Sequence, residues 1–294
     1  VGLGNWSLSA LTSGATGNTA LGHQAGSNTT SADNCVFVGM NAGADITTGH
    51  RNIAIGYNTV NGSGGATGDH NVIVGNAAGY VLTSASGSVF VGADAGSSVT
   101  TGNRNIGIGY DALNGGTTTG DNNIAIGVSA GDALTSGYDN VLMGPNAGGA
   151  ITTGYYNIAI GAGGVGDAIT DGIHNILVGT NNCGGAIIGG DKNVAMGGSA
   201  LEQVTTGDGN IAIGYNSGQG NTTANYNVTV GNSAGDLTGA GNVAIGKGTL
   251  SGNGDGTYNV GLGYEAGNDI STGDYNVAVG AYALDAEDTG NKNV

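Results

Sequence analysis

The stretch Asn52-Ile53-Ala54-Ile55-Gly56 determines the fold of this chain, because the same pattern returns throughout its 294 residues. Two further clear copies are Asn123-Ile124-Ala125-Ile126-Gly127 and Asn210-Ile211-Ala212-Ile213-Gly214. Each copy is followed by a polar segment, often with Ala-Gly, and commonly by Thr-Thr-Gly. The glycines that close the copies stand at positions 4, 22, 39, 56, 75, 92, 109, 127, 144, 161, 179, 197, 214, 231, 246, 263 and 280, so the spacing is mostly 17 or 18.

A repeat of this length is too short for a helix, a strand and two turns, but it suits one coil of a β-solenoid. We expect two short strands and two corners in each coil, with neighbouring coils about 4.8 Å apart. Nothing interrupts the repeats. The sequence therefore predicts an all-β protein, one continuous β-solenoid of about seventeen coils over residues 1–294, with both ends in mid-repeat.

The composition narrows the classes of protein. Sixty-four glycines with a single Pro, and no Gly at every third position, exclude collagen. The content of 38% hydrophobic and 9% charged residues argues against disorder. A net charge of −16 offers no basic footprint for nucleic acid or an anionic membrane surface, and no apolar run is long enough to span a bilayer.

The hydrophobic positions of the motif alternate, so they share one face of the strand. Its first and third strand residues, such as Ile53 and Ile55, are nearly always Val, Ile, Leu or Met, and we expect them to line the coil interior. The residue between them should then face outward, yet it is uncharged and mostly apolar. A strand that is apolar on both faces is buried on both. This predicts a homo-oligomer, most naturally a trimer, with a seam formed by Phe37, Ala54, Ile73, Phe90, Ala125, Leu142, Leu177 and Ala212.

The polar positions of the motif have structural interpretations. Stacked Asn side chains, including Asn52, Asn123 and Asn210, can form a hydrogen-bonded ladder along the coils. The closing glycines, such as Gly56, Gly127 and Gly214, are expected to turn a corner with positive φ. We predict that the position before Asn is an outer corner, because basic and aromatic residues occur there. These residues are Arg51, Arg104, Lys192, Lys292, Tyr156, Tyr226, Tyr258 and Tyr275.

The Asn-Val/Ile-Ala-Ile-Gly core resembles the Asn-Ser-Val-Ala-Ile-Gly head repeats of trimeric autotransporter adhesins of the YadA-like type. The longer unit ending in Thr-Thr-Gly-x-x-Asn resembles repeats in tail-fibre and surface proteins of marine phages and bacteria. The resemblance covers nearly the whole chain. It implies a left-handed parallel β-roll, a parallel homotrimer and an adhesive setting. Within these 294 residues we expect no counterpart of the adhesin's coiled-coil neck, stalk or membrane anchor.

Motifs typical of cofactor or metal sites have an ordinary explanation here. Residues 161–166 match G-x-G-x-x-G, but no helical pattern follows, so we expect no dinucleotide site. The four histidines, His23, His50, His70 and His174, are too far apart in a solenoid to converge on a metal. The Asp residues do not follow the nonapeptide calcium pattern, which leaves calcium at a corner as a minor alternative. We predict no catalytic, cofactor-binding or metal-binding residues.

Other residues leave alternatives open. The tyrosines after the closing Gly, namely Tyr57, Tyr110, Tyr215 and Tyr264, favour corner packing, with carbohydrate binding as the alternative. Glycosylation sequons begin at Asn5, Asn28, Asn221 and Asn227, which is weak evidence in a chain rich in Asn and Thr. About eight coils separate Cys35 from Cys183, so we expect no disulfide between them.

The sequence favours a structural role. We expect the shaft of an extracellular or virion fibre that serves attachment, assembled from copies of itself, with a host-surface glycan or protein bound through a tip outside the array. The alternative is a self-assembling extracellular filament whose subunits stack end to end. An ice-binding solenoid would need a flat outward array of Thr, which is interrupted here. An enzyme is the least favoured class.

Overall fold

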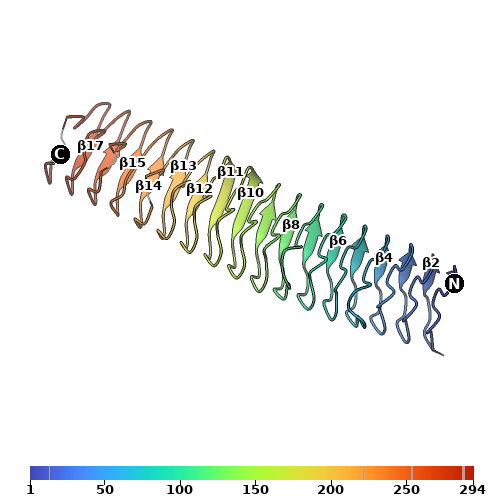
Figure 1. The fold of residues 1–294 in the computed structure, drawn as a ribbon. Coiled ribbons are helices and arrows are strands. Elements are labelled where there is room, and N and C mark those ends of the chain that lie inside the picture. Colours follow the sequence, from blue (N-terminus) through green and yellow to red (C-terminus); the bar gives the residue numbers. More distant parts are fainter. Residues whose placement is uncertain (13, 221, 253, 287–288) are drawn as a thin grey trace. The chain divides into compact units, whose positions relative to one another are not determined.

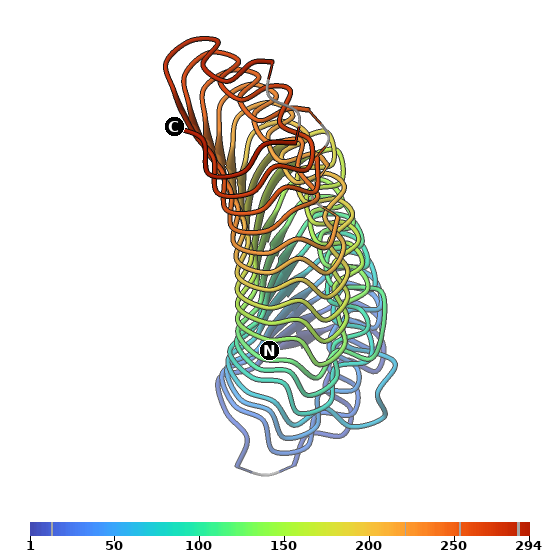
Figure 2. The same ribbon diagram turned by 90° about the vertical axis from the view of Figure 1, so that its left-hand side faces the viewer.

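A computed structural model describes residues 1–12, 14–220, 222–252, 254–286 and 289–294, which form two compact units, Val1–Thr153 and Gly154–Val294. Each unit is a parallel β-solenoid, and its coils are stacked in sequence order (Figures 1 and 2). The prediction of an all-β, parallel β-solenoid is therefore confirmed. The prediction of one unbroken array over residues 1–294 concerns how the two units join and stays a prediction.

Nearly every coil contributes one short strand. The first unit contains β1 (Gly2–Leu3), β2 (Thr19–Leu21), β3 (Val36–Val38), β4 (Ile53–Ile55), β5 (Val72–Val74), β6 (Val89–Val91), β7 (Ile106–Ile108), β8 (Ile124–Ile126) and β9 (Val141–Met143). The second contains β10 (Ile158–Ala162), β11 (Ile176–Thr180), β12 (Val194–Met196), β13 (Ile211–Ile213), β14 (Val228–Val230), β15 (Val243–Ile245), β16 (Val260–Leu262) and β17 (Val277–Val279). No helix long and apolar enough to cross a membrane occurs in these described parts.

Within each unit, every strand pairs in parallel with the next and keeps equivalent motif positions opposite each other. In the β4–β5 pair, for example, Ile53 lies opposite Val72, and Ala54 lies opposite Ile73. The register survives although the repeat length varies, since the extra residues lie in corners. A shift by one residue inside a strand would turn its side chains to the other face.

The expectation of two strands per coil was wrong. On the far side of the coil, pairing in the described residues is limited to isolated bridges between Ile46 and Ala66, Val99 and Thr118, and Leu237 and Gly254. Backbone hydrogen bonds between coils continue there, as from the Thr83 N–H to the Thr100 carbonyl at 3.0 Å. Corners of varying length and residues with positive φ leave no extended run on that side.

The two faces of the strand are the reverse of our expectation. The middle residues, which we had assigned to an oligomer seam, are fully buried inside a single chain, as their exposed fraction of 0% shows: Phe37, Ala54, Ile73, Phe90, Ala125, Leu142, Leu177 and Ala212. The flanking Val, Ile, Leu and Met residues face outward and are partly exposed. The predicted seam is therefore wrong in its residues, because those residues have no surface to offer a second chain.

The narrowness of the coil explains this reversal. The interior is already occupied by the Ala of the Ala-Gly segment and by a second apolar residue, such as Ala42 and Ile46 in one coil. A large middle residue fits only beside glycine. The Phe37 ring packs against Gly26 and Gly43, where an added Cβ would collide with ring carbons. The interior therefore takes mostly Ala and Gly at the middle position, and the bulkier branched residues are placed outside.

The Asn residues form the predicted ladder, and it lies inside the coil. The Asn71 side chain donates to Asn52 Oδ1 at 3.1 Å and to the Ala85 carbonyl at 2.8 Å, and the Asn71 backbone N–H also reaches Asn52 Oδ1 at 2.9 Å. Equivalent bonds join Asn193 to Asn210. Asn and the middle residue are two positions apart, so both face inward, and this ladder satisfies polar groups that would otherwise be buried without partners.

The closing glycines and the residues before Asn both turn corners, as predicted. Gly56, Gly127 and Gly214 have φ of 135°, 140° and 133°. A Cβ on Gly56 would collide with the Gly75 carbonyl oxygen in the next coil, so these positions need glycine for space as well as for conformation. The residues before Asn have a left-handed backbone conformation although most are not glycine, as at Arg51 (φ 58°) and Tyr258 (φ 57°). The side chains of these two residues are exposed.

Candidate functional site

The most prominent surface of each unit is the outward strand face, which we define as the first and third residues of strands β2–β17. All but Thr19 are Val, Ile, Leu or Met, and none is charged. They are partly exposed, with 39% for Ile213 and 45% for Leu262. Because equivalent positions are paired from coil to coil, these side chains form two rows along each unit, apolar except at Thr19.

One edge of this face is the column of residues that precede the ladder Asn, which we call the pre-Asn column. In the first unit it is mainly polar: the Arg51 guanidinium lies 3.1 Å from His70 Nε2, and the Arg104 Nε donates to Asn122 Oδ1 at 2.7 Å. In the second unit it is largely aromatic. Tyr258 and Tyr275 stack there, with ring centroids 5.2 Å apart and an interplanar angle of 11°.

A second polar ladder runs beside the pre-Asn column and was missed by the sequence reasoning. In this ladder, the side chain two positions before the ladder Asn accepts a hydrogen bond. The donor is the backbone N–H of the equivalent residue in the preceding coil. Asp191 Oδ1 accepts from Ile173, and Asp208 Oδ1 accepts from Asp191, each at 2.8 Å. The frequent Asp or Asn at this position was the feature of the sequence that could have predicted this ladder. In the same ladder, hydrogen bonds from the Thr257 backbone N–H and hydroxyl lower the pKa of Asp274.

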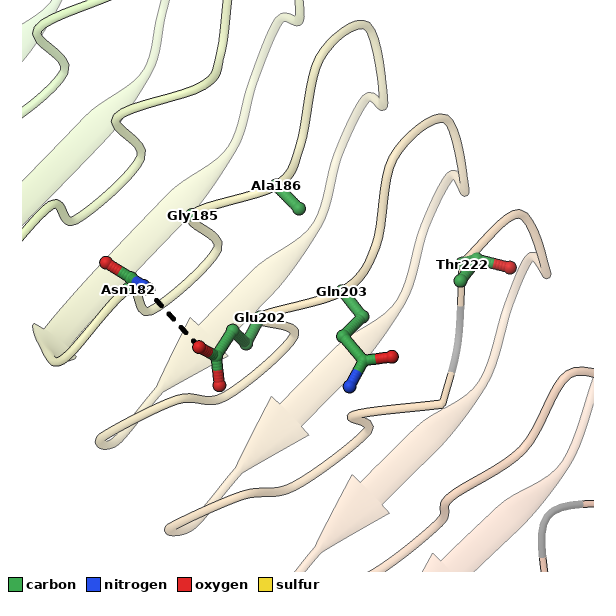
Figure 3. Close-up of a pocket in the computed structure, with 6 residues that line it drawn as sticks. All are labelled: Asn182, Gly185, Ala186, Glu202, Gln203 and Thr222. Carbon is green, nitrogen blue, oxygen red and sulfur yellow. Dashed lines mark hydrogen bonds between the residues drawn. The ribbon is translucent and has the colours of Figure 1, made fainter.

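A depression with a volume of about 560 Å³ lies over the coils of β11–β13 in the second unit (Figure 3). The carboxylate of Glu202 accepts from Asn182 Nδ2 at 3.5 Å and from Gln219 Nε2 at 3.1 Å. Glu202 is the one ionisable side chain among the six lining residues, Asn182, Gly185, Ala186, Glu202, Gln203 and Thr222. Glu202 is therefore the one candidate for proton transfer among these lining residues.

The histidines lie in corner columns and make local contacts. His50 Nδ1 accepts the Asp33 backbone N–H at 3.0 Å, and the His174 ring packs against Tyr155 and Tyr156. No three His, Cys, Asp or Glu side chains are grouped as metal ligands in the described residues. Residues 161–166 run from the end of β10 into a turn, and the described residues after it continue without a helix.

The tyrosines after the closing glycines, Tyr57, Tyr110, Tyr215 and Tyr264, are exposed along the other edge of the outward strand face. Tyr264 packs edge-on against Tyr282 at 5.3 Å and lies 5.6 Å from the Lys247 ammonium group. A hydrogen bond to Glu265 and the charge of Glu265 raise the pKa of Tyr264 to about 12. The contacts of Tyr264 are those of corner packing. The choice between corner packing and carbohydrate binding for the four tyrosines stays a prediction.

The sequons differ in accessibility. Asn5 and Asn28 are exposed, whereas Asn227 is a buried member of the interior ladder and Asn221 lies outside the described residues. The Asn227 side chain donates to the Gly239 carbonyl at 2.9 Å and is therefore part of the fold.

Both cysteines are free and buried, in agreement with the expectation that they do not pair. Cys35 replaces Asn in the interior ladder, where its backbone N–H donates to Asn18 Oδ1 at 2.9 Å. Burial raises the pKa of Cys35, and burial raises the pKa of Cys183 to about 11. Each thiol therefore lacks both the thiolate and the access that reactivity requires.

We predict that neither thiol reacts with Ellman's reagent at pH 8 in the folded chain, and that both react in guanidinium chloride. The physical reason is the small thiolate fraction combined with full burial. The measurement is the absorbance of the released thionitrobenzoate over time. Rapid release of one equivalent from the folded chain would contradict the interior positions of these two residues.

Comparison with known proteins gives no relative: no protein-family model, no curated protein and no solved structure matches this chain.

Proposed function

We propose that the chain is the structural shaft of an extracellular or virion fibre that serves attachment. In this proposal, left-handed β-rolls associate as a parallel homotrimer through the outward strand face. The observation that carries the proposal is the pair of uncharged apolar rows along each unit, because a surface of this kind is normally covered. The number of chains and the handedness come from the resemblance to trimeric β-roll repeats.

The size of the face supports an interface. Strands β10–β17 contribute sixteen outward side chains, so at roughly 50 Å² each they expose on the order of 800 Å². The largest apolar patch on a typical monomer is about 300–600 Å². A standard protein–protein interface buries about 800 Å² on each partner. One unit therefore presents as much apolar surface as a stable interface uses.

The regular register supports a second copy as the occupant of this face. The outward residues recur once per coil with equivalent positions in register, as in the pairs Ile211–Val228 and Val228–Val243. Another copy of the chain has the same rise per coil, so its rows can meet these rows coil by coil over their whole length. A partner with a different repeat would lose this match after a few coils.

The proposal predicts that Ile126→Asp and Ile213→Asp disperse the assembly, because a carboxylate buried in an apolar interface costs several kcal/mol. Thr48→Asp, at an exposed corner, is the matched control and should have no effect. Sedimentation equilibrium should give about three times the chain mass of 28.2 kDa for the native chain and the control, and 28.2 kDa for the two variants.

A native chain that sediments as a monomer at micromolar concentration, or variants that keep the native mass, would refute association through this face. A mass that grows without limit as the concentration rises would favour the end-to-end filament over the shaft. Circular dichroism of the dispersed variants should remain that of the native chain, because both substituted positions lie outside the coil interior.

A further inference from the structure

A notch interrupts the outer columns of the second unit at the coil that contains β15. Where a coil has glycine in the pre-Asn column, the side chain of that column in the next coil leans over it. Tyr226 lies over Gly209 and Tyr258 lies over Gly241, each with its Cδ1 within 2.8 Å of the place where a Cβ of that glycine would stand. Because the β15 coil carries Gly241 at this position, no ring from that coil covers Tyr226 in the same way.

The two tyrosines form the walls of this notch. Tyr258 and Tyr275 belong to adjacent coils, and their stacked rings have centroids 5.2 Å apart. Tyr226 and Tyr258 belong to the β14 and β16 coils, and two steps of about 4.8 Å per coil place their positions about 10 Å apart along the stack. A single ring placed between them lies about 5 Å from each wall, within the stacking range of about 4.5–7 Å. Both walls are open to solvent, with Tyr226 exposed by 70% and Tyr258 by 55%.

The floor of the same notch offers a hydrogen-bond donor. In the second polar ladder, which runs beside the pre-Asn column, the backbone N–H of Asp208 donates to Asn225 Oδ1 of the next coil at 2.7 Å. The equivalent partner of the Asn225 N–H is Ala240, which has no acceptor in its side chain. No hydrogen bond of the Asn225 N–H is found among the residues that the structure describes. Two adjacent small residues thus remove both the ring and the acceptor that other coils supply.

We propose that this notch binds an N-acetylhexosamine residue of a glycan. Such a sugar carries the two groups that the β15 coil lacks: a pyranose ring, which fits between Tyr226 and Tyr258, and an acetamido carbonyl, which accepts from the Asn225 N–H as Asn225 Oδ1 does from Asp208. The sugar is neutral, which suits a chain of net charge −16, whereas sialylated or sulfated glycans are repelled. The other glycines of the pre-Asn column lack this pair of tyrosine walls, since Gly87 has Arg104 beside it and Gly209 follows Lys192.

The test is saturation-transfer NMR with the methyl glycosides of N-acetylglucosamine and N-acetylgalactosamine at millimolar concentration, and with methyl glucoside as the probe that lacks the acetamide. The native chain should give transfer to the ring and acetyl protons of at least one N-acetyl sugar. Methyl glucoside should bind up to about tenfold more weakly, the effect of one lost hydrogen bond of 0.5–1.5 kcal/mol.

Two variants fill the notch with residue types that other coils carry at the same positions. Gly241→Tyr must also shift the Tyr258 ring, which lies within 2.8 Å of the place of its Cβ, so the native circular dichroism spectrum is the control for folding of both variants. Ala240→Asn supplies the missing acceptor and should weaken binding up to about tenfold, the effect of the one hydrogen bond that it takes from the sugar. Gly241→Tyr supplies the missing ring and should reduce transfer by about tenfold or more. Gly87→Tyr adds a tyrosine at the same column in the first unit and should leave transfer unchanged. The proposal is overturned if the native chain shows no transfer, if methyl glucoside binds as well as the N-acetyl sugars, or if Gly241→Tyr binds as the native chain does. Ile213→Asp should keep binding while it disperses the assembly, so this result is independent of the proposed self-association.

Discussion

Ala125→Asp is expected to destabilise the first unit by about 3–5 kcal/mol, the usual cost of a buried charge without a partner. Ala125 is fully buried in the coil interior and lies opposite Gly107 and Leu142 in the neighbouring strands. Neither neighbour can hydrogen-bond a carboxylate through its side chain. The change should appear as a lower midpoint of guanidinium unfolding, followed by far-ultraviolet circular dichroism.

The matched control for this variant is Ile126→Asp, which places the same charge one residue along the strand. Its side chain faces outward, so the folded coil should tolerate it and only the association should be lost. If Ala125→Asp unfolds at the native midpoint while Ile126→Asp unfolds early, the interior and exterior of the strand are the reverse of those described.

Gly127→Ala is expected to have an effect of similar size for a different reason. Gly127 has φ of 140°, and a Cβ there would lie 2.5 Å from the Gly144 carbonyl oxygen in the next coil. The contact is with backbone, so the two coils must separate and lose hydrogen bonds between them. We expect a loss of about 3 kcal/mol or more, because the steric cost adds to the 1–2 kcal/mol of an unfavourable φ.

Gly64→Ala separates these two contributions. Gly64 also has a positive φ, 71°, but no atom lies within 4 Å of the place where its Cβ would stand. It should therefore lose only about 1–2 kcal/mol, the cost of the left-handed conformation alone. Equal losses in the two variants, measured by guanidinium unfolding, would show that close packing of the glycines does not contribute to stability.

The repeat was sufficient to predict the solenoid, the Asn ladder and the glycine corners. These features depend on residues such as Asn52 and Gly56, whose chemistry allows few local conformations and which recur at one spacing. A short-range pattern that repeats with a fixed period also fixes the long-range pairing, because each coil can pair only with its neighbours. This is why the coil-to-coil register followed from the sequence.

The direction of the strand faces did not follow from hydrophobicity. Ile53 and Ile55 are the larger and more regular apolar residues, so they were assigned to the interior, whereas the structure places Ala54 there. The overlooked constraint was shared space: the interior already holds the Asn ladder, the Ala of the Ala-Gly segment and a second apolar residue, so Ala or Gly occupies the middle position in most coils. Asn52 gave the correct direction, since it shares a face with Ala54 and its amide is satisfied inside the coil.

The notch at the β15 coil could not be found from any single motif either. Ala240 and Gly241 are unremarkable in a chain rich in both residues. Their effect depends on the leaning of Tyr226 and Tyr258 over preceding coils, and on an outer ladder whose acceptors come from the following coil. Such relations between coils become visible only when the repeats are superposed in three dimensions.

The central claim is that the outward strand face, and not the middle residue of the strand, joins one copy of the chain to the next. The most direct test places a single cysteine at Ile213→Cys or at Ala212→Cys, in a chain in which Cys35→Asn and Cys183→Ala remove the native thiols. Each variant is treated with a short bismaleimide and separated by denaturing electrophoresis. The account predicts covalent dimers for Ile213→Cys, since each chain has one thiol and can be linked to one other chain. It predicts an unmodified single chain for Ala212→Cys, because Ala212 is fully buried. Cross-linking through position 212, or its absence at position 213, would contradict it.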